Sequence, residues 1–330
     1  MTHSFAKDRY DRMQYRRCGR SGLQLPAVAL GAWETYGGTQ DGDVAKACMF
    51  RAFDLGITHF DLANNYGTPA GNAEIVCGKI LKDMPRDELI ISSKAGYRMW
   101  PGPYGEWGSR KYLIASCDQS LKRTGLEYFD IFYSHRPDPN TPIEETMGAL
   151  DTLVKQGKAL YVGVSSYTGA QLDAAQEAVK RGGLAPITIH QPYYNMLGRT
   201  IEKDLLPAAD RHGIGVIAFC PLASGLLSGK KYLDGDVPAD TRPAREWASS
   251  WVASKSKDEK KRILGGLNGL AKERGQTLAQ MAVAWVLRHK SMVSTVMGAS
   301  RVEQVEQNVA ALAKLDFTAA ELAAIDALTA

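Results

Sequence analysis

Residues 59 to 67, with the sequence HFDLANNYG, begin like a buried β-strand and turn polar within three residues. Asp61 places a carboxylate at the end of the apolar run, and Tyr66 follows five positions later. In barrels of parallel strands, the carboxyl ends of the strands carry the active site. This stretch therefore predicts a strand that ends at a functional cavity and a loop that carries Tyr66 over that cavity.

Seven other short runs of the chain are rich in β-branched or aromatic residues, and most are nearly continuously apolar. This pattern is typical of parallel strands that are covered on both faces. The eight predicted strands span residues 27–33, 58–63, 89–95, 129–135, 159–166, 187–191, 215–220 and 294–300.

Amphipathic segments alternate with these strands and predict helices. Ser109 is a candidate N-cap, and Gly56 and Gly125 stand where C-caps would. Thr141 and Glu144 have the spacing of a capping box. The predicted helices span residues 43–56, 72–84, 109–125, 141–157, 168–182, 201–213, 277–290 and 302–315.

Eight alternating strands and helices predict an α/β fold, a (β/α)8 TIM barrel formed by a single domain over residues 1–330. An open, doubly wound sheet is the alternative architecture. Three segments lie outside the repeat. They are an N-terminal β-hairpin (14–26), a long loop (222–262) and a C-terminal extra helix (318–329).

The composition is that of a globular protein, with 45% hydrophobic residues and a formal net charge of +4 in 330 residues. The basic residues are scattered, so no nucleic-acid partner is indicated. Five cysteines without a C-x-x-C motif argue against a disulfide framework or a zinc site, and for a reducing compartment. The longest apolar run, residues 213–227, is too short and too interrupted to span a membrane. We therefore expect a cytoplasmic protein with no membrane partner.

Polar residues end five consecutive predicted strands, from the second to the sixth. One such residue means little, since a neighbouring loop can satisfy it. Five converge at one mouth of a barrel, so a shared polar site is the better interpretation. These strand ends carry Asp61, Lys94, His135, Ser165 with Ser166, and Gln191.

Four residues have the chemistry to protonate an oxygen while a hydride arrives at the adjacent carbon. A free phenol has a pKa of about 10, so Tyr66 alone is a poor acid at neutral pH. The ammonium group of Lys94 would favour the phenolate and make Tyr66 a better proton donor. Asp61 would balance the charge of Lys94, which is costly to bury alone. His135 could hydrogen-bond a carbonyl oxygen.

Each of these residues also has a structural interpretation. Asp61 and Lys94 could form a structural ion pair, and Tyr66 and His135 could be packing residues. Their joint position at successive strand ends favours catalysis. A metal site of Asp61, His135 and His190 is disfavoured, because alternation should turn His190 to the other face of its strand. We therefore expect no metal.

Eight stretches carry motifs of one known family. They are GAW (31–33), HFDLANNYG (59–67), ISSKAG (91–96), YFDIFYSHRPD (128–138), GKALYVGVSSY (157–167), HQPYYN (190–195), IAFCPLASGLLSGK (217–230) and GASRVEQVEQN (298–308). Through them the chain resembles the aldo-keto reductases over essentially its full length. Within that family the likeness is strongest to the bacterial branch that reduces L-glyceraldehyde 3-phosphate, and next to the potassium-channel β-subunits.

The resemblance implies NADPH-dependent reduction of small aldehydes to alcohols, with L-glyceraldehyde 3-phosphate and methylglyoxal-like compounds as substrates. Tyr66 would be the general acid, assisted by Lys94 and Asp61. His135 would orient the substrate carbonyl. The long loop would close over the cofactor. The implied cofactor-binding residues are Trp33, Asp61, Ser165, Ser166, Gln191, Phe219, Cys220, Pro221, Leu222, Ser224, Gly225, Lys230, Arg242, Gly298, Ser300, Arg301, Gln304, Gln307 and Asn308.

Several expectations stay open. The sequence does not decide whether Lys230 or the adjacent Lys231 reaches the pyrophosphate. Two other functions also stay open, a cofactor-sensing binding protein like the channel β-subunits and a reductase of a larger ketone or xenobiotic. The resemblance suggests a homo-oligomer of four or more copies. The expected substrate wall consists of Trp33, Tyr36, Tyr66, Tyr97, Met99, Trp100, His135 and Arg136.

Overall fold

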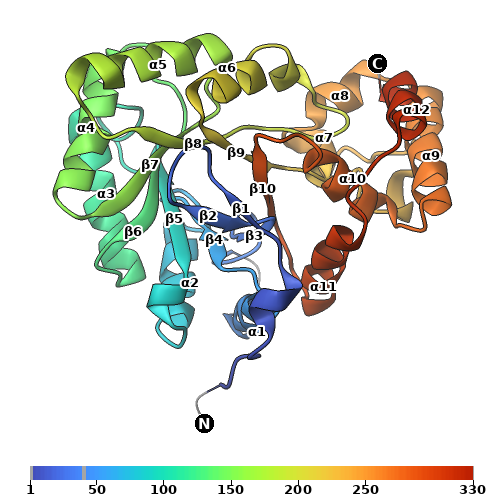
Figure 1. The fold of residues 1–330 in the computed structure, drawn as a ribbon, viewed down its shortest axis with the longest axis horizontal. Helices are drawn as coiled ribbons and strands as arrows, with labels where there is room; N and C mark the ends of the chain where they lie inside the picture. The colour runs from blue at the N-terminus through green and yellow to red at the C-terminus, as the bar shows by residue number, and fades with distance from the viewer. Residues whose placement is uncertain (1–2, 39–41, 330) are drawn as a thin grey trace.

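The computed structural model describes residues 3–38 and 42–329, in which eight parallel strands close into a barrel (Figure 1). The strand order around the barrel is β10-β3-β4-β5-β6-β7-β8-β9, and Thr295 opposite Val28 closes the ring. The predicted TIM barrel is confirmed, and the open sheet is wrong. The strands are β3 (Val28–Gly31), β4 (His59–Asp61), β5 (Ile90–Ala95), β6 (Phe129–Ser134), β7 (Ala159–Ser165), β8 (Ile187–Gln191), β9 (Gly215–Phe219) and β10 (Met292–Met297).

Helices surround the barrel and cover the outer faces of its strands (Figure 1). The predicted caps of α3 form, with Ser109 Oγ accepting a hydrogen bond from Tyr112 N and Gly125 at φ 71°. The helices that follow the strands are α1 (Gly42–Asp54), α2 (Asn72–Leu81), α3 (Arg110–Thr124), α4 (Ile143–Lys155), α5 (Gly169–Gly182), α6 (Leu205–His212), α10 (Leu278–Val286) and α11 (Val302–Ala310).

The predicted capping box at the start of α4 is wrong. The helix begins at Ile143, and its N-cap is Pro142, which has no side-chain hydrogen bond to offer. The hydroxyl of Thr141 instead donates to Asp138 Oδ2 at 2.6 Å. The hydroxyl of Thr141 therefore bonds to the neighbouring loop and does not cap the helix.

The segment predicted as a long loop, residues 222–262, contains helical structure. It holds two short 3-10 turns, η4 (Ala223–Gly225) and η5 (Lys230–Tyr232), and the helices α7 (Arg242–Arg245) and α8 (Ser249–Ser254). It also holds the start of α9 (Lys257–Glu273), a helix that the sequence reading missed. A capping box marks this start, because Ser256 and Glu259 exchange side-chain and backbone hydrogen bonds. The predicted C-terminal helix is confirmed as α12 (Ala319–Thr329).

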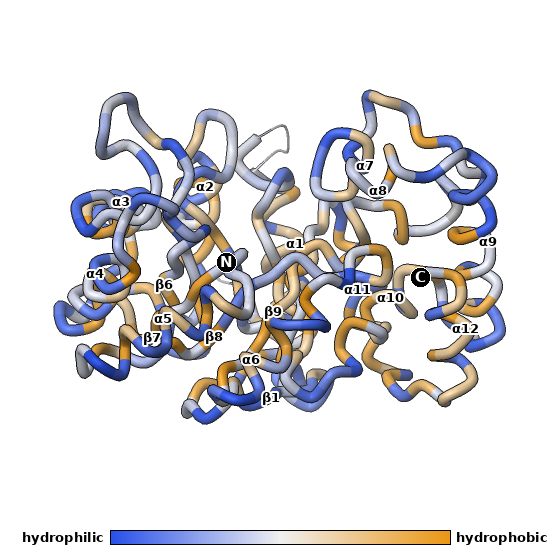
Figure 2. Tube along the Cα trace, turned by 90° about the horizontal axis from the view of Figure 1, so that it is seen from above, coloured by the Kyte–Doolittle hydropathy of each residue, from blue (hydrophilic) through white to orange (hydrophobic). Residues whose placement is uncertain are grey.

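The predicted N-terminal hairpin is confirmed as the antiparallel pair β1 (Tyr15–Arg17) and β2 (Gln24–Pro26). In Figure 2 the label of β1 lies at the opposite end of the molecule from α7 and α8. The Arg16 guanidinium ties the hairpin to the barrel through Leu287 O at 2.9 Å and Met292 O at 3.0 Å. The hairpin also contacts the backbone of Gly213 through Gly19. A β-carbon at Gly19 would lie 2.0 Å from Gly213 O, so this contact requires glycine.

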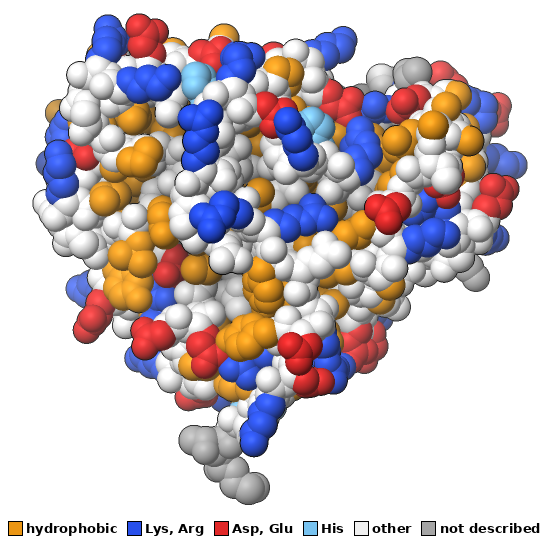
Figure 3. Space-filling view, viewed as in Figure 1, with side chains coloured by type: hydrophobic (Ala, Val, Ile, Leu, Met, Phe, Trp, Pro, Cys, Tyr) orange, Lys and Arg blue, Asp and Glu red, His pale blue; other side chains and the backbone are white. Residues whose placement is uncertain are grey.

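The face that carries the hairpin is charged. Figure 3 shows Lys and Arg side chains gathered over its middle, with acidic side chains towards its edges. Arg17, Arg20 and Lys290 border a second, smaller cavity at this end of the molecule. The large cavity described below lies elsewhere, and none of these three residues lines it.

Apolar side chains pack on both the inner and the outer face of the barrel wall. Inside the barrel, Leu25 of the hairpin packs with residues such as Ile131, Tyr133, Ile189 and Ile217. A larger cluster joins the outer faces of the strands to the helices, and Figure 2 shows hydrophobic residues concentrated towards the strands. Among the described residues, no helix is both long enough and apolar enough to cross a membrane.

Candidate active site

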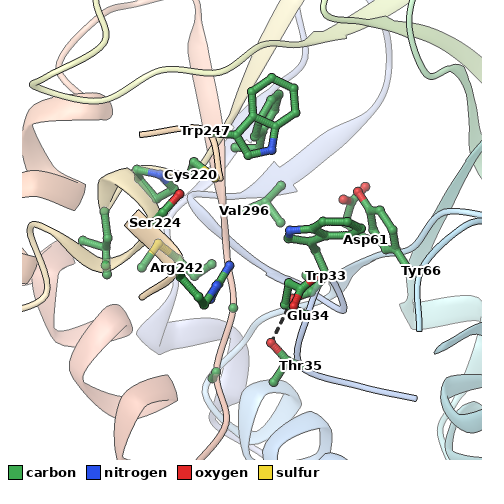
Figure 4. Close-up of a pocket in the computed structure, with 18 of the residues that line it drawn as sticks. Trp33, Glu34, Thr35, Asp61, Tyr66, Cys220, Ser224, Arg242, Trp247 and Val296 are labelled. Carbon is green, nitrogen blue, oxygen red and sulfur yellow. Dashed lines mark hydrogen bonds between the residues drawn. The ribbon is translucent and has the colours of Figure 1, made fainter. Parts of the chain in front are cut away.

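A cavity of about 690 Å³ opens at the carboxyl ends of the barrel strands. Figure 4 shows Asp61 and Tyr66 on one side of it, and Cys220, Arg242 and Trp247 on the other. The cavity brings together most residues that the sequence predicted for the site. These are Trp33, Asp61, Tyr66, Tyr97, His135, Ser165, Ser166, Gln191, Phe219, Cys220, Pro221, Leu222, Ser224, Gly225, Arg242, Gly298, Ser300 and Gln304.

Strands β4 and β5 place four polar side chains together, because alternate residues of a strand share one face. On β5, the Ser92 hydroxyl donates a hydrogen bond to Asp61 Oδ1 of β4 at 2.6 Å. His59 Nε2 lies 3.0 Å from Ser92 Oγ. Burial lowers the pKa of His59 to about 4, so its imidazole is neutral at neutral pH. This network holds Asp61 from below and leaves its second oxygen for Lys94.

Lys94 is fully buried, and its charge is balanced inside the protein. Its Nζ lies 2.5 Å from Asp61 Oδ2 and donates to Leu62 O at 2.8 Å. The ion pair that the sequence predicted is therefore present. Burial lowers the pKa of Lys94, while the negative charge of Asp61 opposes this shift and favours the ammonium.

Tyr66 lies over this ion pair, with its Oη 3.3 Å from Lys94 Nζ. Burial raises the pKa of Tyr66 well above 10, and the negative charge of Asp61 adds to the rise. Burial thus sets the net direction of the Tyr66 pKa, and the expectation that Lys94 makes Tyr66 a better proton donor stays a prediction. The phenol is protonated at neutral pH, as a proton donor must be.

His135 stands opposite Tyr66, at the carboxyl end of β6. The two rings lie 5.9 Å apart between centroids, and the ring of Tyr97 meets His135 edge-on at 4.7 Å. Burial lowers the pKa of His135 well below 6.5, and the positive charges of Lys94 and Arg136 add to the effect. A neutral imidazole cannot act as the acid, but it can donate a hydrogen bond to a carbonyl oxygen.

The next two strand ends connect to the same group of residues. Gln191 Nε2 donates to Asp61 Oδ1 at 3.2 Å, and Ser165 Oγ donates to Gln191 O at 2.8 Å. Asp61 therefore has hydrogen-bond partners on β5 and β8 as well as its ion pair. The side chains of Ser165 and Gln191 are both buried at the cavity wall.

Backbone strain gathers at this cavity. Among the residues that the structure describes, six non-glycine residues adopt the left-handed region, and four of them, Glu34, Ser166, Cys220 and Ser224, line the cavity. Such conformations cost about 1–3 kcal/mol each and are typical of ligand sites. No sequence pattern identifies these residues, because their conformation is imposed by the surrounding structure.

The cavity has basic residues on the side of the long loop. Arg242 lines it and pairs with Glu246 through contacts of 2.7 and 3.0 Å. Lys231 also lines it. The side chain of Lys230, the other lysine that the sequence offers for the pyrophosphate, lies outside the described part of the structure.

Four residues predicted for the substrate wall do not line the cavity. Tyr36 is buried beside Cys48, and burial raises the pKa of Tyr36 well above 10. Met99 and Trp100 pack against the core, because the loop after β5 turns them inward. Arg136 lies over the ring of Trp107 at 3.6 Å.

The charge of Arg136 is also neutralised, by the loop that connects β5 to α3. Its Nη2 pairs with Glu106 at 2.9 Å, and its Nε donates to Gly96 O at 2.9 Å. The ring of Tyr97 covers the guanidinium at 4.3 Å. These contacts explain why this cation is directed at the neighbouring loop between β5 and α3 rather than at the cavity.

Three of the residues implied for cofactor binding also lie outside the cavity lining. Arg301 and Gln307 are exposed, and Asn308 is buried within α11. Gln304 does line the cavity, where its Oε1 accepts hydrogen bonds from Ser300 N at 2.7 Å and Ser300 Oγ at 3.1 Å.

Trp247 is the main wall residue that the sequence reading missed. It lies between α7 and α8, lines the cavity and is 44% exposed. Its ring stacks on Tyr193 at 5.8 Å and meets Phe219 edge-on at 4.9 Å. An aromatic residue within a long irregular segment carries no sequence signal that would place it here. Other lining residues that the sequence did not indicate are Gly31, Glu34, Thr35, Asn65, Ser228, Tyr232, Thr241, Val296, Met297 and Ala299.

The acidic and imidazole groups of the site are not arranged as metal ligands. No group of three His, Cys, Asp or Glu side chains within residues 3–38 and 42–329 could hold a metal ion. His190 has its Nε2 3.1 Å from Tyr167 O, in keeping with a side chain turned away from the polar end of β8.

Comparison with known proteins gives a consistent family. The sequence profile of the Aldo/keto reductase family matches residues 27–330. L-glyceraldehyde 3-phosphate reductase of Escherichia coli K12 is 52% identical over 325 residues, which cover 97% of this chain and 93% of the relative. A probable voltage-gated potassium channel subunit beta of Arabidopsis thaliana is 37% identical, with 91% of each chain covered. A putative one from Schizosaccharomyces pombe is 38% identical, covering 92% of this chain and 89% of the relative.

Proposed function

Because the chain belongs to the aldo/keto reductase family, we propose that it reduces small aldehydes to alcohols with NADPH. We propose L-glyceraldehyde 3-phosphate as the first substrate to test and methylglyoxal as the second, since the bacterial relative at 52% identity is named for the former. The observation that carries the proposal is the buried chain of contacts from Asp61 through Lys94 to the protonated Tyr66.

In the proposed mechanism, Tyr66 gives its proton to the carbonyl oxygen of the aldehyde. The phenolate that results would lie beside the ammonium of Lys94, whose contact with Tyr66 Oη measures 3.3 Å. Asp61 keeps Lys94 charged in its buried position. A positive charge that is already fixed where negative charge develops lowers the activation barrier of the proton transfer, because the site does not have to reorganise during the reaction.

His135 has a different part in this mechanism. Its neutral imidazole would donate a hydrogen bond to the same carbonyl oxygen and fix its orientation. Trp33, whose ring lies 4.9 Å from that of Tyr66, and Tyr97 would confine the aldehyde between Tyr66 and His135. The sequence-predicted roles of Tyr36, Met99, Trp100 and Arg136 are not part of this proposal.

The cavity lining fits NADPH, which when bound supplies the hydride. Ser165 and Gln191 offer hydrogen-bonding groups for a carboxamide, and Phe219 offers an aromatic face for the nicotinamide. Ser224 Oγ is buried and has no partner among the described residues, which suits a phosphate oxygen. Arg242 and Lys231 supply positive charge on the loop side. We propose Ser300 and Gln304 at the adenosine end, with the exposed Arg301 reaching the 2′-phosphate.

Two other functions follow from specific observations. The identity of 37% to a protein named as a potassium channel subunit favours a cofactor-sensing role, in which NADPH binds but aldehydes are hardly reduced. The aromatic wall that includes Trp247 favours a larger ketone or xenobiotic substrate. A substrate panel read by NADPH absorbance separates the three, since the sensor would leave NADPH unconsumed with every compound.

The decisive experiment compares Tyr66→Phe with Tyr15→Phe. Tyr15 belongs to the hairpin, outside the site, and its Oη donates to Gly56 O at 2.6 Å. Tyr15→Phe therefore also loses a tyrosine hydrogen bond, but one that is remote from the site. Tyr66→Phe should bind NADPH like the parent protein and lose nearly all turnover, whereas Tyr15→Phe should keep it. Unchanged turnover in Tyr66→Phe would refute the proposed acid.

We also propose that the protein works as one catalytic domain in a cytoplasmic homo-oligomer of four or more copies. This proposal follows from the resemblance to the family. Light scattering on the purified protein measures the number of copies directly, and a monomeric mass would contradict it.

A further inference from the structure

Two loops at the barrel mouth carry the groups that meet the substrate. The loop between β4 and α2, residues 62–71, carries Tyr66. The loop between β5 and α3, residues 96–109, begins with Gly96 and Tyr97, and the Tyr97 ring packs edge-on against His135 at 4.7 Å. The position of one loop relative to the other therefore bears on the distance between the proton donor and the imidazole.

Asn64 anchors the first loop from inside the protein. Its side chain is fully buried, although it lies only two residues before Tyr66. Its backbone N donates to Lys94 O at 3.0 Å, and its side-chain Nδ2 donates to Tyr112 Oη at 3.1 Å. These two donated bonds hold the chain on its path towards Tyr66, while Asn64 Oδ1 is buried without a partner among the described residues.

Tyr112 connects this anchor to the second loop. It lies in the first turn of α3, where Ser109 Oγ accepts a hydrogen bond from its backbone N, and it is fully buried. Its Oη donates a short hydrogen bond to Tyr97 O. Its ring packs against Trp100 at 5.2 Å. One hydroxyl thus accepts from the first loop and donates to the second.

The second loop passes this constraint on to His135. The backbone of Tyr97 is held by Tyr112, and its ring lies between His135 at 4.7 Å and the guanidinium of Arg136 at 4.3 Å. Arg136 also binds Gly96 O at 2.9 Å. The start of the loop therefore has little freedom to move without displacing the wall against which His135 packs.

We propose that Asn64, Tyr112 and the backbone carbonyl of Tyr97 form a brace that sets the spacing between Tyr66 and His135. Asn64 and Tyr112 are then positioning residues of the reaction, an inference that rests on the proposed function. The aldehyde oxygen must lie within hydrogen-bond distance of both Tyr66 and His135. A displacement of about 1 Å in such a site can cost roughly 100-fold in rate.

The test removes one oxygen with Tyr112→Phe, which keeps the ring against Trp100. The matched control is Tyr15→Phe, which also removes a tyrosine hydroxyl bonded to a backbone carbonyl, in the hairpin. We expect kcat of Tyr112→Phe to fall about 10-fold to 100-fold, with the Kd for NADPH unchanged. Asn64→Ala should lower kcat similarly, and the double variant should lose little more, because each change breaks the same brace.

A second measurement does not depend on turnover. Hydrogen–deuterium exchange of Tyr112→Phe should be faster than in the parent protein in both loops, 62–71 and 96–109, and unchanged there in Tyr15→Phe. Loops that exchange at the parent rate would overturn the brace, as would kcat within twofold of the parent. An equal loss of kcat in Tyr112→Phe and in the control Tyr15→Phe would overturn it too. A parent protein that reduces no aldehyde would refute the proposed function, and the exchange rates would still decide on the brace.

Discussion

The buried ion pair between Asp61 and Lys94 leads to the sharpest prediction, for the variant Asp61→Asn. The two charged atoms lie 2.5 Å apart, and the side chains are 2% and 0% exposed. Asparagine keeps the shape of the residue but removes its negative charge. The ammonium of Lys94 is then buried without its counter-ion, and removal of one partner of a buried pair costs about 3–5 kcal/mol.

Two physical quantities limit this loss of stability from above. At an effective dielectric constant of about 20, Coulomb attraction at 2.5 Å is roughly 7 kcal/mol before desolvation is subtracted. Lys94 can also escape by losing its proton. At pH 7.5 that escape costs about 4 kcal/mol, because the ordinary lysine pKa lies about three units higher and each unit is worth about 1.36 kcal/mol. The charge part of the loss therefore cannot exceed about 4 kcal/mol at this pH.

The sign of the pH dependence follows from the same argument. Burial lowers the pKa of Lys94 even beside Asp61, so we expect Lys94 to be neutral in folded Asp61→Asn, while the unfolded chain keeps it protonated up to about pH 10.5. The unfolded state thus binds more protons, so the stability of the variant rises with pH. Its deficit relative to the parent protein should shrink by about 3 kcal/mol between pH 7.5 and 9.5.

Urea unfolding followed by tryptophan fluorescence at the two pH values measures this deficit. Asp83→Asn is the matched control, because Asp83 pairs with Lys46 at 2.6 Å on the surface and should lose at most about 1 kcal/mol. The double variant Asp61→Asn/Lys94→Met should be more stable than Asp61→Asn, since no charge remains buried. A deficit that is below about 1 kcal/mol, or the same at both pH values, would refute the reasoning.

Three further predictions concern other parts of the molecule. Burial lowers the pKa of His190 to about 3, so the unfolded chain takes up its proton first and stability falls below about pH 6.5. This residue should account for about 2 kcal/mol of the loss by pH 5, and His190→Gln should flatten urea midpoints between pH 7 and 5. Gly163→Ala would place a β-carbon 2.5 Å from the Tyr133 ring, so it should destabilise the protein by about 1–3 kcal/mol, and an unchanged melting temperature would contradict this packing. Arg242→Ala should weaken the binding of both NADPH and NADH, whereas Arg301→Ala should weaken NADPH alone, as measured by fluorescence titration. Equal effects of Arg301→Ala on both cofactors would remove it from the 2′-phosphate.

The fold was predictable from the sequence because its strands are apolar runs that give way abruptly to polar residues at their ends. Each predicted strand overlaps the observed one, although the last was placed at 294–300 and is found at Met292–Met297. The helix α9 was predictable too, since Ser256 and Glu259 form a capping box before an amphipathic segment. Thr141 misled because its hydroxyl had a competing partner, Asp138, in the adjacent loop.

The site was predictable where strands position it and less so where loops do. Asp61, Lys94 and His135 follow apolar runs, so the barrel geometry alone brings them to one mouth. Tyr36 and Trp247 lie in irregular segments whose direction depends on contacts with distant residues. Only the structure shows that the first is buried beside Cys48 and the second faces the cavity. The upward pKa shift of Tyr66 likewise depends on burial, which a motif does not report.

The hairpin at the closed end of the barrel has a consequence for biosynthesis. Arg16 is bound to Leu287 O and Met292 O, which lie 271 and 276 positions later in the chain. At translation rates of about 5–20 residues per second, the hairpin must wait roughly 14 to 55 seconds for these partners to be made. Throughout that interval Leu25, which is fully buried in the finished protein, has no completed barrel to enter. The hairpin therefore stays an exposed apolar segment of the nascent chain during this interval. Chaperones that bind such segments have more time to bind the hairpin than any segment made later.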